Sequence, residues 1–266
     1  MTFTVGLIGL GKIGAFYDLN SSNTMTHLNA ISKDIRFSLS FAYDPSETTC
    51  ASVREYYDIE NVFHNMTDIQ NDKLQADLIV VASPTNSHLD SIQSLLEFIS
   101  PLMVLCEKPL ADNLLDSQKI AELCRQKNIN IATNFMRRSL PLFGELKEKI
   151  ASQFPGPHDV VVKYSGCFSN NGSHFVDLIS YFYGEPESVL WRSSEKTNES
   201  EFKVRAIVSH KNAVCSYIPL SSISVVDHEV EILTDDFKLV IGRAGRDVHL
   251  YEVEDDPDFS GAFQYG

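Results

Sequence analysis

The chain has 266 residues, of which 43% are hydrophobic and 22% charged, a composition typical of a globular protein. Its 13 Gly, 10 Pro and 5 Cys exclude a collagen-like or disulfide-dense protein. With 22 basic and 36 acidic residues, the net charge is −14. An acidic surface repels nucleic-acid phosphates and anionic lipid headgroups, so we expect neither nucleic acid nor a membrane as a partner.

The apolar segments and the cysteines indicate a cytoplasmic protein. No apolar run reaches the roughly 18 residues of a membrane span, and Met1–Ile8 lacks the basic start of a signal peptide. The cysteines are odd in number, far apart and without a Cys-x-x-Cys pair, at Cys50, Cys106, Cys124, Cys167 and Cys215. This pattern predicts reduced thiols and no metal site.

The first 136 residues alternate apolar, strand-like runs with helical patterns. The expected strands are Phe3–Ile8, Phe37–Tyr43, Leu78–Ala82, Leu102–Cys106 and Ile129–Phe135. The expected helices are Met25–Ile35, His88–Phe98 and Leu114–Lys127. Such alternation predicts βαβ units and a doubly wound parallel sheet.

From residue 137 onward, strands follow one another. Helices are expected at Leu142–Ile150 and Phe175–Phe182. The expected strands are Asp159–Tyr164, Glu187–Trp191, Phe202–Ser209, Ala213–Ile218, His228–Leu233, Phe237–Ile241 and Val248–Val253. Short polar turns between several of them indicate an antiparallel meander. We therefore predict two domains, residues 1–136 and 137–266.

A glycine-rich turn follows the first strand, with the sequence Gly9-Leu10-Gly11-Lys12-Ile13-Gly14. It fits the G-x-G-x-x-G pattern in the required place, between an apolar strand and a helix. Gly9 permits the tight turn, Gly11 lets a pyrophosphate approach the backbone, and Gly14 permits close helix–strand packing. We predict that this turn binds a dinucleotide; a glycine turn without a ligand is the alternative.

Asp44 ends the second predicted strand and is the candidate ribose ligand. It lies 30 residues after Gly14, where about 20 is usual, and the polar stretch Asn20–Asn23 accounts for the excess as an insertion. A carboxylate there accepts hydrogen bonds from a ribose diol and repels a 2′-phosphate, which favours NAD over NADP. The alternative is that Asp44 only starts a turn before Pro45.

Several motifs occur together in one order along the chain. They are the glycine turn, Ala82–His88, Glu107-Lys108-Pro109, Asn134–Arg138 and Gly172–Asp177. With them, the chain resembles the Gfo/Idh/MocA oxidoreductases over roughly residues 3 to 240. The resemblance implies NAD(P)-dependent chemistry on sugars, polyols or related compounds. It also implies a Rossmann domain followed by an open α/β domain with a large, mainly antiparallel sheet.

The resemblance and the strand ends assign candidate residues in the first domain. Lys108 follows a strand, where ligands of open parallel sheets bind, and is expected to donate a hydrogen bond to a substrate oxygen. Glu107 is expected to orient nearby groups, and the Lys108–Pro109 peptide is expected to be cis. The residues expected to line the cofactor cleft are Ser83, Pro84, Thr85, Asn86 and His88, although His88 is equally well explained as a helix N-terminal residue.

In the second domain, His174 is the candidate acid/base, since histidine titrates near neutral pH. Asp177, one helical turn later, is expected to line the substrate site. Asn170 stands where the family commonly has an aspartate. Three interpretations are open. The proton transfer at His174 is adjusted to an uncharged neighbour, the chain belongs to a branch of the family that uses Asn, or the site is inactive.

Arg137 and Arg138 suit a substrate carboxylate or phosphate, with a structural salt bridge as the alternative. We expect Lys108 and His174 to face one cavity between the domains.

We therefore predict an NAD-dependent oxidoreductase that transfers a hydride to or from a sugar, polyol or nucleotide-sugar derivative, in bacterial surface-glycan metabolism. We also expect a homo-oligomer formed through the C-terminal sheet. The alternative is a non-catalytic dinucleotide-binding regulatory or scaffold protein, motivated by Asn170 and by a chain shorter than is common in the family.

Overall fold

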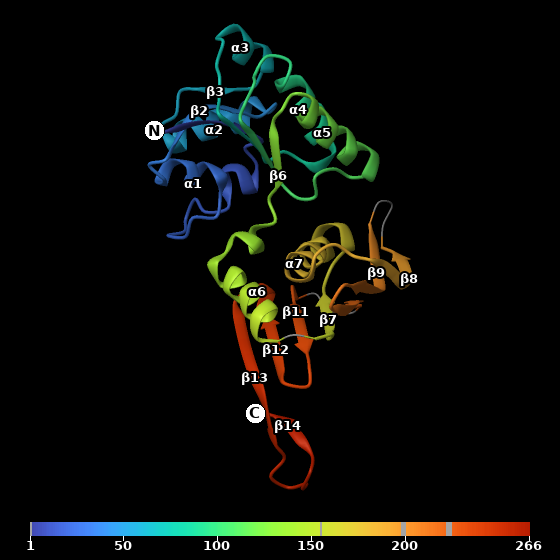
Figure 1. The fold of residues 1–266 in the computed structure, drawn as a ribbon. Coiled ribbons are helices and arrows are strands. Elements are labelled where there is room, and N and C mark those ends of the chain that lie inside the picture. The colour runs from blue at the N-terminus through green and yellow to red at the C-terminus, as the bar shows by residue number, and fades with distance from the viewer. Residues whose placement is uncertain (1, 155, 198–200, 222–224) are drawn as a thin grey trace. The chain divides into compact units, whose positions relative to one another are not determined.

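The computed structural model describes residues 2–154, 156–197, 201–221 and 225–266 (Figure 1). The chain divides into two compact units, Met1–Asn134 and Phe135–Gly266, whereas the sequence places the boundary after residue 136. We describe each unit separately.

Unit 1 contains a six-stranded parallel sheet in the order β3-β2-β1-β4-β5-β6. The strands are β1 (Phe3–Ile8), β2 (Phe37–Tyr43), β3 (Val62–Phe63), β4 (Leu78–Val81), β5 (Met103–Cys106) and β6 (Asn130–Thr133). The order reverses between β1 and β4, so ligands are expected beside the carboxyl ends of these two strands. This is the doubly wound sheet predicted from the sequence.

Helices cover both faces of this sheet. They are the π-turn η1 (Lys12–Phe16), α1 (His27–Lys33), α2 (Glu47–Tyr57), α3 (Met66–Asn71), the 3-10 turn η2 (Thr85–Ser87), α4 (His88–Leu95) and α5 (Leu114–Gln126). Leu28 of α1 and Val53 of α2 belong to one buried apolar cluster. Ile92 of α4 and Ile120 of α5 belong to another. The two clusters explain why β4 is apolar along its length, as expected for a strand covered on both sides.

Unit 2 contains an eight-stranded, mainly antiparallel sheet in the order β14-β13-β12-β11-β7-β10-β9-β8. The strands are β7 (His158–Tyr164), β8 (Ser188–Lys196), β9 (Phe202–His210), β10 (Ala213–Pro219), β11 (His228–Leu233), β12 (Phe237–Gly242), β13 (Asp247–Asp255) and β14 (Phe263–Tyr265). The expectation of a simple meander is wrong at the centre. There, β7 is inserted between β10 and β11 and runs parallel to β10.

One face of the second sheet is covered by helices α6 (Pro141–Gln153) and α7 (Ser173–Tyr183). Two short turns complete the covering segments, η3 (Met136–Ser139) and the π-turn η4 (Phe168–Gly172), and η5 (Arg243–Gly245) joins β12 to β13. Alternate strand residues such as Val162, Tyr217 and Val230 are buried against Phe143 and Leu178 of the helices. The period-2 pattern of burial follows from the alternation of side chains along a strand.

Candidate functional site

A cavity of about 570 Å³ lies at the carboxyl ends of β1, β2 and β4 in unit 1. Its lining includes Gly9, Gly11, Lys12, Ile13, Tyr43, Asp44, Ser83 and Pro84. The topology brings these residues to one edge of the sheet, because Gly9 follows β1, Asp44 follows β2 and Ser83 follows β4. The cavity therefore joins the glycine turn, the candidate ribose ligand and the strand-end segment that the sequence singled out.

The three glycines of the turn have different surroundings. Gly9 has φ +90°, and a Cβ there would lie 2.3 Å from the Ser83 backbone nitrogen. A Cβ on Gly14 would lie 2.1 Å from the Gly9 carbonyl oxygen. A Cβ on Gly11 would meet nothing within 4 Å, because Gly11 borders the cavity. Gly9 and Gly14 are thus required by the fold, whereas no protein atom near Gly11 requires a glycine there.

Asp44 holds the glycine turn as well as bordering the cavity. Its Oδ2 accepts a hydrogen bond from the Leu10 backbone N–H at 2.9 Å, and its Oδ1 accepts one from Ser46 N–H at 3.0 Å. A carboxylate has about four acceptor sites, so both oxygens retain lone pairs for a ribose diol. The predicted role and the alternative turn role are compatible in this geometry.

The segment after β4 separates into exposed and buried parts. Ser83 and Pro84 line the cavity, and Thr85 begins η2. His88 is buried, with Nε2 2.8 Å from the Ser83 carbonyl and Nδ1 3.1 Å from the Leu110 carbonyl. His88 is not among the residues that line the cavity. It is the first residue of α4 and contacts backbone carbonyls of two loops, which agrees with the alternative of a helix N-terminal residue.

Lys108 lies in the loop that follows β5, and the Lys108–Pro109 peptide is cis, as expected. Glu107 donates its backbone N–H to the Val81 carbonyl at 2.8 Å, and Asn134 donates to the Cys106 carbonyl at 2.7 Å. These bonds continue the pairing of β4, β5 and β6 past their last residues. The Lys108 loop therefore lies at the same sheet edge as the strand ends that border the cavity.

In unit 2, four of the predicted site residues lie where η3 packs against the start of α7. They are Arg137, Arg138, His174 and Asp177. Phe135 contacts the His174 ring edge-to-face, with ring centroids 5.8 Å apart. The Arg138 guanidinium binds both carboxylate oxygens of Asp177. The Arg137 guanidinium lies 5.1 Å from the centroid of the Phe175 ring. We call Phe135, Arg137, Arg138, His174, Phe175 and Asp177 the η3–α7 cluster.

Burial controls the electrostatics of this cluster. The Asp177 side chain is only 9% exposed, and burial raises its pKa although the Arg138 guanidinium lowers it. Burial also lowers the pKa of Arg137. Arg138 forms the structural salt bridge that was the alternative to substrate binding, because its guanidinium faces Asp177. Asn170 is exposed and lies in η4, one short turn before α7.

Two residues near the glycine turn have no counterpart among the sequence-based candidates. Asp18 is buried and accepts hydrogen bonds from Met25 N–H at 2.6 Å, from Thr26 N–H at 2.9 Å and from the Asn29 amide at 3.0 Å. Burial raises its pKa, but these bonds outweigh burial and lower the pKa to about 2. His27, the first residue of α1, binds Glu107. The sequence signal that could have drawn attention to these residues is Thr26, a helix N-cap before an apolar pattern.

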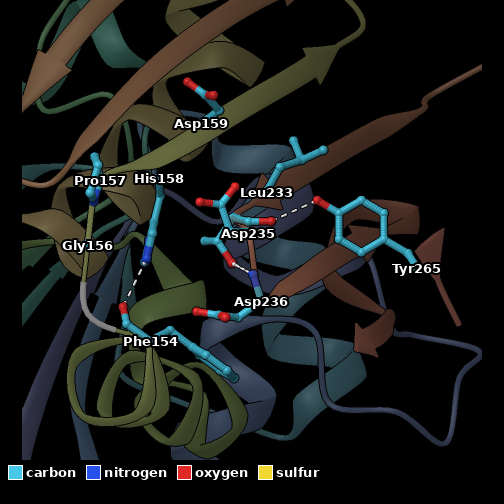
Figure 2. A pocket seen from close by; sticks show the side chains of 10 residues that line it. Phe154, Gly156, Pro157, His158, Asp159, Leu233, Asp235, Asp236 and Tyr265 are labelled. Carbon is cyan, nitrogen blue, oxygen red and sulfur yellow. Dashed lines mark hydrogen bonds between the residues drawn. The ribbon is translucent and has the colours of Figure 1, made fainter. Parts of the chain in front are cut away.

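A second cavity of about 420 Å³ lies in unit 2 between the end of α6, β7 and the β11–β12 turn (Figure 2). His158 closes one side with Nε2 bound to the Phe154 carbonyl at 3.0 Å, and the Tyr265 hydroxyl donates to the Thr234 carbonyl at 2.8 Å. Asp235 and Asp236 make the cavity acidic. Across the described residues, we find no group of three or more His, Cys, Asp and Glu side chains able to hold a metal ion.

No helix among the described ranges combines the length and the apolar character needed to cross a membrane.

The strand order of unit 1 and its glycine-lined cavity define a dinucleotide-binding fold of the Rossmann type. Residues 3–135 match the family described as "Oxidoreductase family, NAD-binding Rossmann fold". The chain belongs to this family, Gfo/Idh/MocA, which confirms the resemblance drawn from its motifs.

Two curated relatives are inositol dehydrogenases. The chain is 27% identical to myo-inositol 2-dehydrogenase of Thermotoga maritima over 68% of its own length and 55% of the relative. It is 25% identical to inositol 2-dehydrogenase 2 of Paenarthrobacter aurescens over 76% of its length and 62% of the relative. The chain thus spans little more than half the length of these relatives.

Among solved structures, the WlbA dehydrogenase from Bordetella pertussis, in complex with NADH and UDP-GlcNAcA, has the same fold. It superposes with a TM-score of 0.76 at 18% identity and covers 95% of this chain and 83% of that one. The fold of both units, including the mainly antiparallel second sheet, is therefore the fold predicted from the sequence.

Proposed function

We propose that the chain is a cytoplasmic NAD(H)-dependent oxidoreductase that transfers a hydride to or from a CH–OH group of a sugar, polyol or nucleotide-sugar derivative. The observation that carries this proposal is the open space at Gly11 inside a cavity that also holds Asp44. The five free thiols, all buried, support a reducing compartment, which fractionation of native cells checks.

The cofactor is held by the residues around this cavity. They are Gly9, Gly11, Lys12, Ile13, Gly14, Asp44, Ser83, Pro84 and Thr85. Gly11 and the first turn of η1 receive the pyrophosphate, with backbone N–H groups as donors. Asp44 binds the ribose diol of the adenosine half. Bound NAD supplies the acceptor for the hydride.

The remaining chemistry is the movement of a proton and the orientation of the substrate. His174 takes the hydroxyl proton during oxidation or returns it during reduction, the usual task of a neutral imidazole. Lys108 donates a hydrogen bond to the same substrate oxygen and stabilises negative charge there. Asp177 and Arg138 fix the start of α7, and Asn170 takes the place of the family's aspartate without its charge. Arg137 contributes positive charge toward an acidic substituent of the substrate.

The names of relatives and of one solved structure support the proposed substrate class. Two are named for inositol, and one solved structure contains UDP-GlcNAcA. A polyol or a nucleotide sugar presents the ring of secondary hydroxyls that this chemistry needs, and a nucleotide-sugar substrate would place the chain in surface-glycan metabolism.

A substrate panel tests the function. Purified protein is mixed with NAD or NADH and a panel of inositols, sugars and nucleotide sugars, and absorbance at the nicotinamide band is followed. Turnover of at least one compound is expected. Cofactor binding without turnover across the panel would contradict the enzyme assignment and support a non-catalytic dinucleotide-binding regulatory protein.

NADH should bind at least about tenfold more tightly than NADPH, because a 2′-phosphate beside the Asp44 carboxylate meets like charge. Fluorescence titration of both dinucleotides measures the ratio. Asp44→Asn keeps an acceptor oxygen for Leu10 N–H but removes the charge. The preference for NADH over NADPH should therefore become smaller. Tighter binding of NADPH by the unaltered protein would refute the role of Asp44.

The face of the second sheet opposite α6 and α7 supports the predicted homo-oligomer. It carries apolar side chains at alternate positions, among them Ile207, Val214 and Ile218, and Trp191 pairs with Ile207 on the same face. Val214 and Trp191 are 40% and 48% exposed. Apolar faces of this kind commonly form isologous dimer interfaces.

Val214→Glu should convert an oligomer into a monomer, since it places charge in the middle of this face. Light scattering coupled to size exclusion gives the mass of each species. Leu115→Glu, on the exposed side of α5 in unit 1, is the matched control and should leave the mass unchanged. A monomeric unaltered protein at tens of micromolar would contradict the proposal.

A further inference from the structure

The Glu107 carboxylate connects three segments of unit 1. Its Oε1 accepts hydrogen bonds from His27 Nε2 at 2.8 Å and from the Asn134 side-chain amide at 2.7 Å. His27 is the first residue of α1, and Asn134 follows β6. The side chains of His27 and Glu107 are only 15% and 14% exposed, so water contributes little to this carboxylate.

The direction of these bonds is fixed by chemistry. Burial raises the pKa of Glu107, but the bonds from His27 and Asn134 outweigh burial and hold the pKa below its ordinary value. Glu107 is therefore ionised near neutral pH and is only an acceptor, so His27 Nε2 carries a hydrogen and donates it. The Lys108 backbone N–H is a further donor to the same carboxylate.

The residue before His27 is held in place by Asp18, which lies between Gly14 and Asp44. The buried Asp18 binds the backbone N–H and the hydroxyl of Thr26, the residue next to His27. Asp18 thus anchors the backbone next to His27, and His27 and the Lys108 backbone N–H both act on the Glu107 carboxylate. Removing the His27 donor leaves the largely buried Glu107 carboxylate with one donor fewer, so it must turn toward water or another donor.

We propose that His27 is a positioning residue for Lys108, acting through the Glu107 carboxylate. The segment from Asp18 to His27 then has a role, which is to present His27 to the Glu107–Lys108 loop. The inference rests on the proposed function only in assigning Lys108 to substrate binding; the hydrogen bonds to Glu107 lie within unit 1 alone.

The first test uses the protein without cofactor or substrate. Competitive acylation with acetic anhydride, read by mass spectrometry, gives the reactivity of Lys108 relative to the exposed Lys119. His27→Ala should change this ratio by roughly threefold or more, because acylation depends on the access and charge surroundings of the amine. His27→Gln, whose amide can donate to Glu107, should restore it. His64→Ala, an exposed histidine of the same unit, is the control.

The second test uses turnover with a substrate identified from the panel. His27→Ala should lower kcat about tenfold, the effect expected for one hydrogen bond to a charged group, with NADH affinity unchanged and partial rescue in His27→Gln. An unchanged Lys108 acylation ratio in His27→Ala, or no difference between the Ala and Gln variants, overturns the proposal.

If His27→Ala does not fold, Glu107→Gln replaces it, since it removes the acceptor charge at constant size, and the same acylation change is expected. If the proposed function is wrong, the unaltered protein should show no turnover. The acylation ratio is measured without substrate, so it still tests the role of His27 in that case.

Discussion

Replacing His174 by alanine should lower turnover by roughly 10²–10⁴-fold, the usual size of a general acid/base contribution. The alcohol proton must leave as the hydride leaves, and the imidazole is the group that we assign to it. NADH affinity should stay within a factor of about two, because the assigned cofactor residues belong to unit 1. Steady-state rates on the identified substrate and fluorescence titration of NADH measure the two effects.

The control for His174→Ala is His249→Ala, which changes an exposed histidine of β13 in the same unit. Loss of the ring contact between His174 and Phe135 costs stability of about 1 kcal/mol, so both variants are compared by thermal unfolding before their rates are compared. Full activity of His174→Ala on the true substrate would exclude the histidine as the acid/base.

Replacing Gly11 by valine should weaken binding of NADH by roughly a hundredfold, or about 3 kcal/mol, because its side chain fills space that the pyrophosphate needs. The backbone at Gly11 has φ −71° and ψ −157°, an extended conformation that valine adopts. No atom lies within 4 Å of the new Cβ, so the fold itself should tolerate the change. Titration of NADH and a thermal melt separate these two statements.

Gly242→Val is the matched control for Gly11→Val. Gly242 also has an extended backbone, with φ −95° and ψ 173°, and a Cβ there also meets nothing within 4 Å. It differs in lying at the end of β12, in unit 2. This variant should bind NADH normally; equal binding by Gly11→Val would show that the cavity is not the pyrophosphate site.

The fold of unit 1 was largely predictable where a local pattern suffices. Phe3–Ile8 and Phe37–Tyr43 are strands at the predicted bounds, since each is an apolar run that ends at turn residues. The helix Glu47–Tyr57 was missed because it buries only Cys50 and Val53 among described positions, too few for a clear apolar stripe. Its N-cap, Ser46, was the available signal.

In unit 2 the strands were predictable but their pairing was not. His228–Leu233 alternates buried and half-buried residues, which predicts a strand. Its pairing with His158–Tyr164 joins residues more than sixty positions apart, and the pairing that makes β7 parallel to β10 joins residues 55 positions apart. A meander is the expectation from short turns alone, and no short-range pattern shows that β7 enters the middle of the sheet.

The site residues also divide into those that a local motif predicts and those that only the fold brings together. The glycine turn and Asp44 were found because their spacing is a motif, and the cavity brings them together. The bond between His27 and Glu107 spans 80 residues, and nothing in the sequence near either residue indicates the other. His88 shows the opposite limit. It occupies a motif position beside the cavity, but its ring is buried, with its two nitrogens 3.1 Å and 2.8 Å from the backbone carbonyls of Leu110 and Ser83.

The boundary between the units falls at a single peptide bond, and the residues on its two sides are both anchors. Asn134 holds Glu107 in unit 1, and Phe135 packs against His174 in unit 2. An insertion at this bond would separate two adjacent residues that each make a side-chain contact within their own unit. A chimera that exchanges substrate units among relatives should therefore cross over between Asn134 and Phe135, so that each residue stays with the unit whose side chain it contacts.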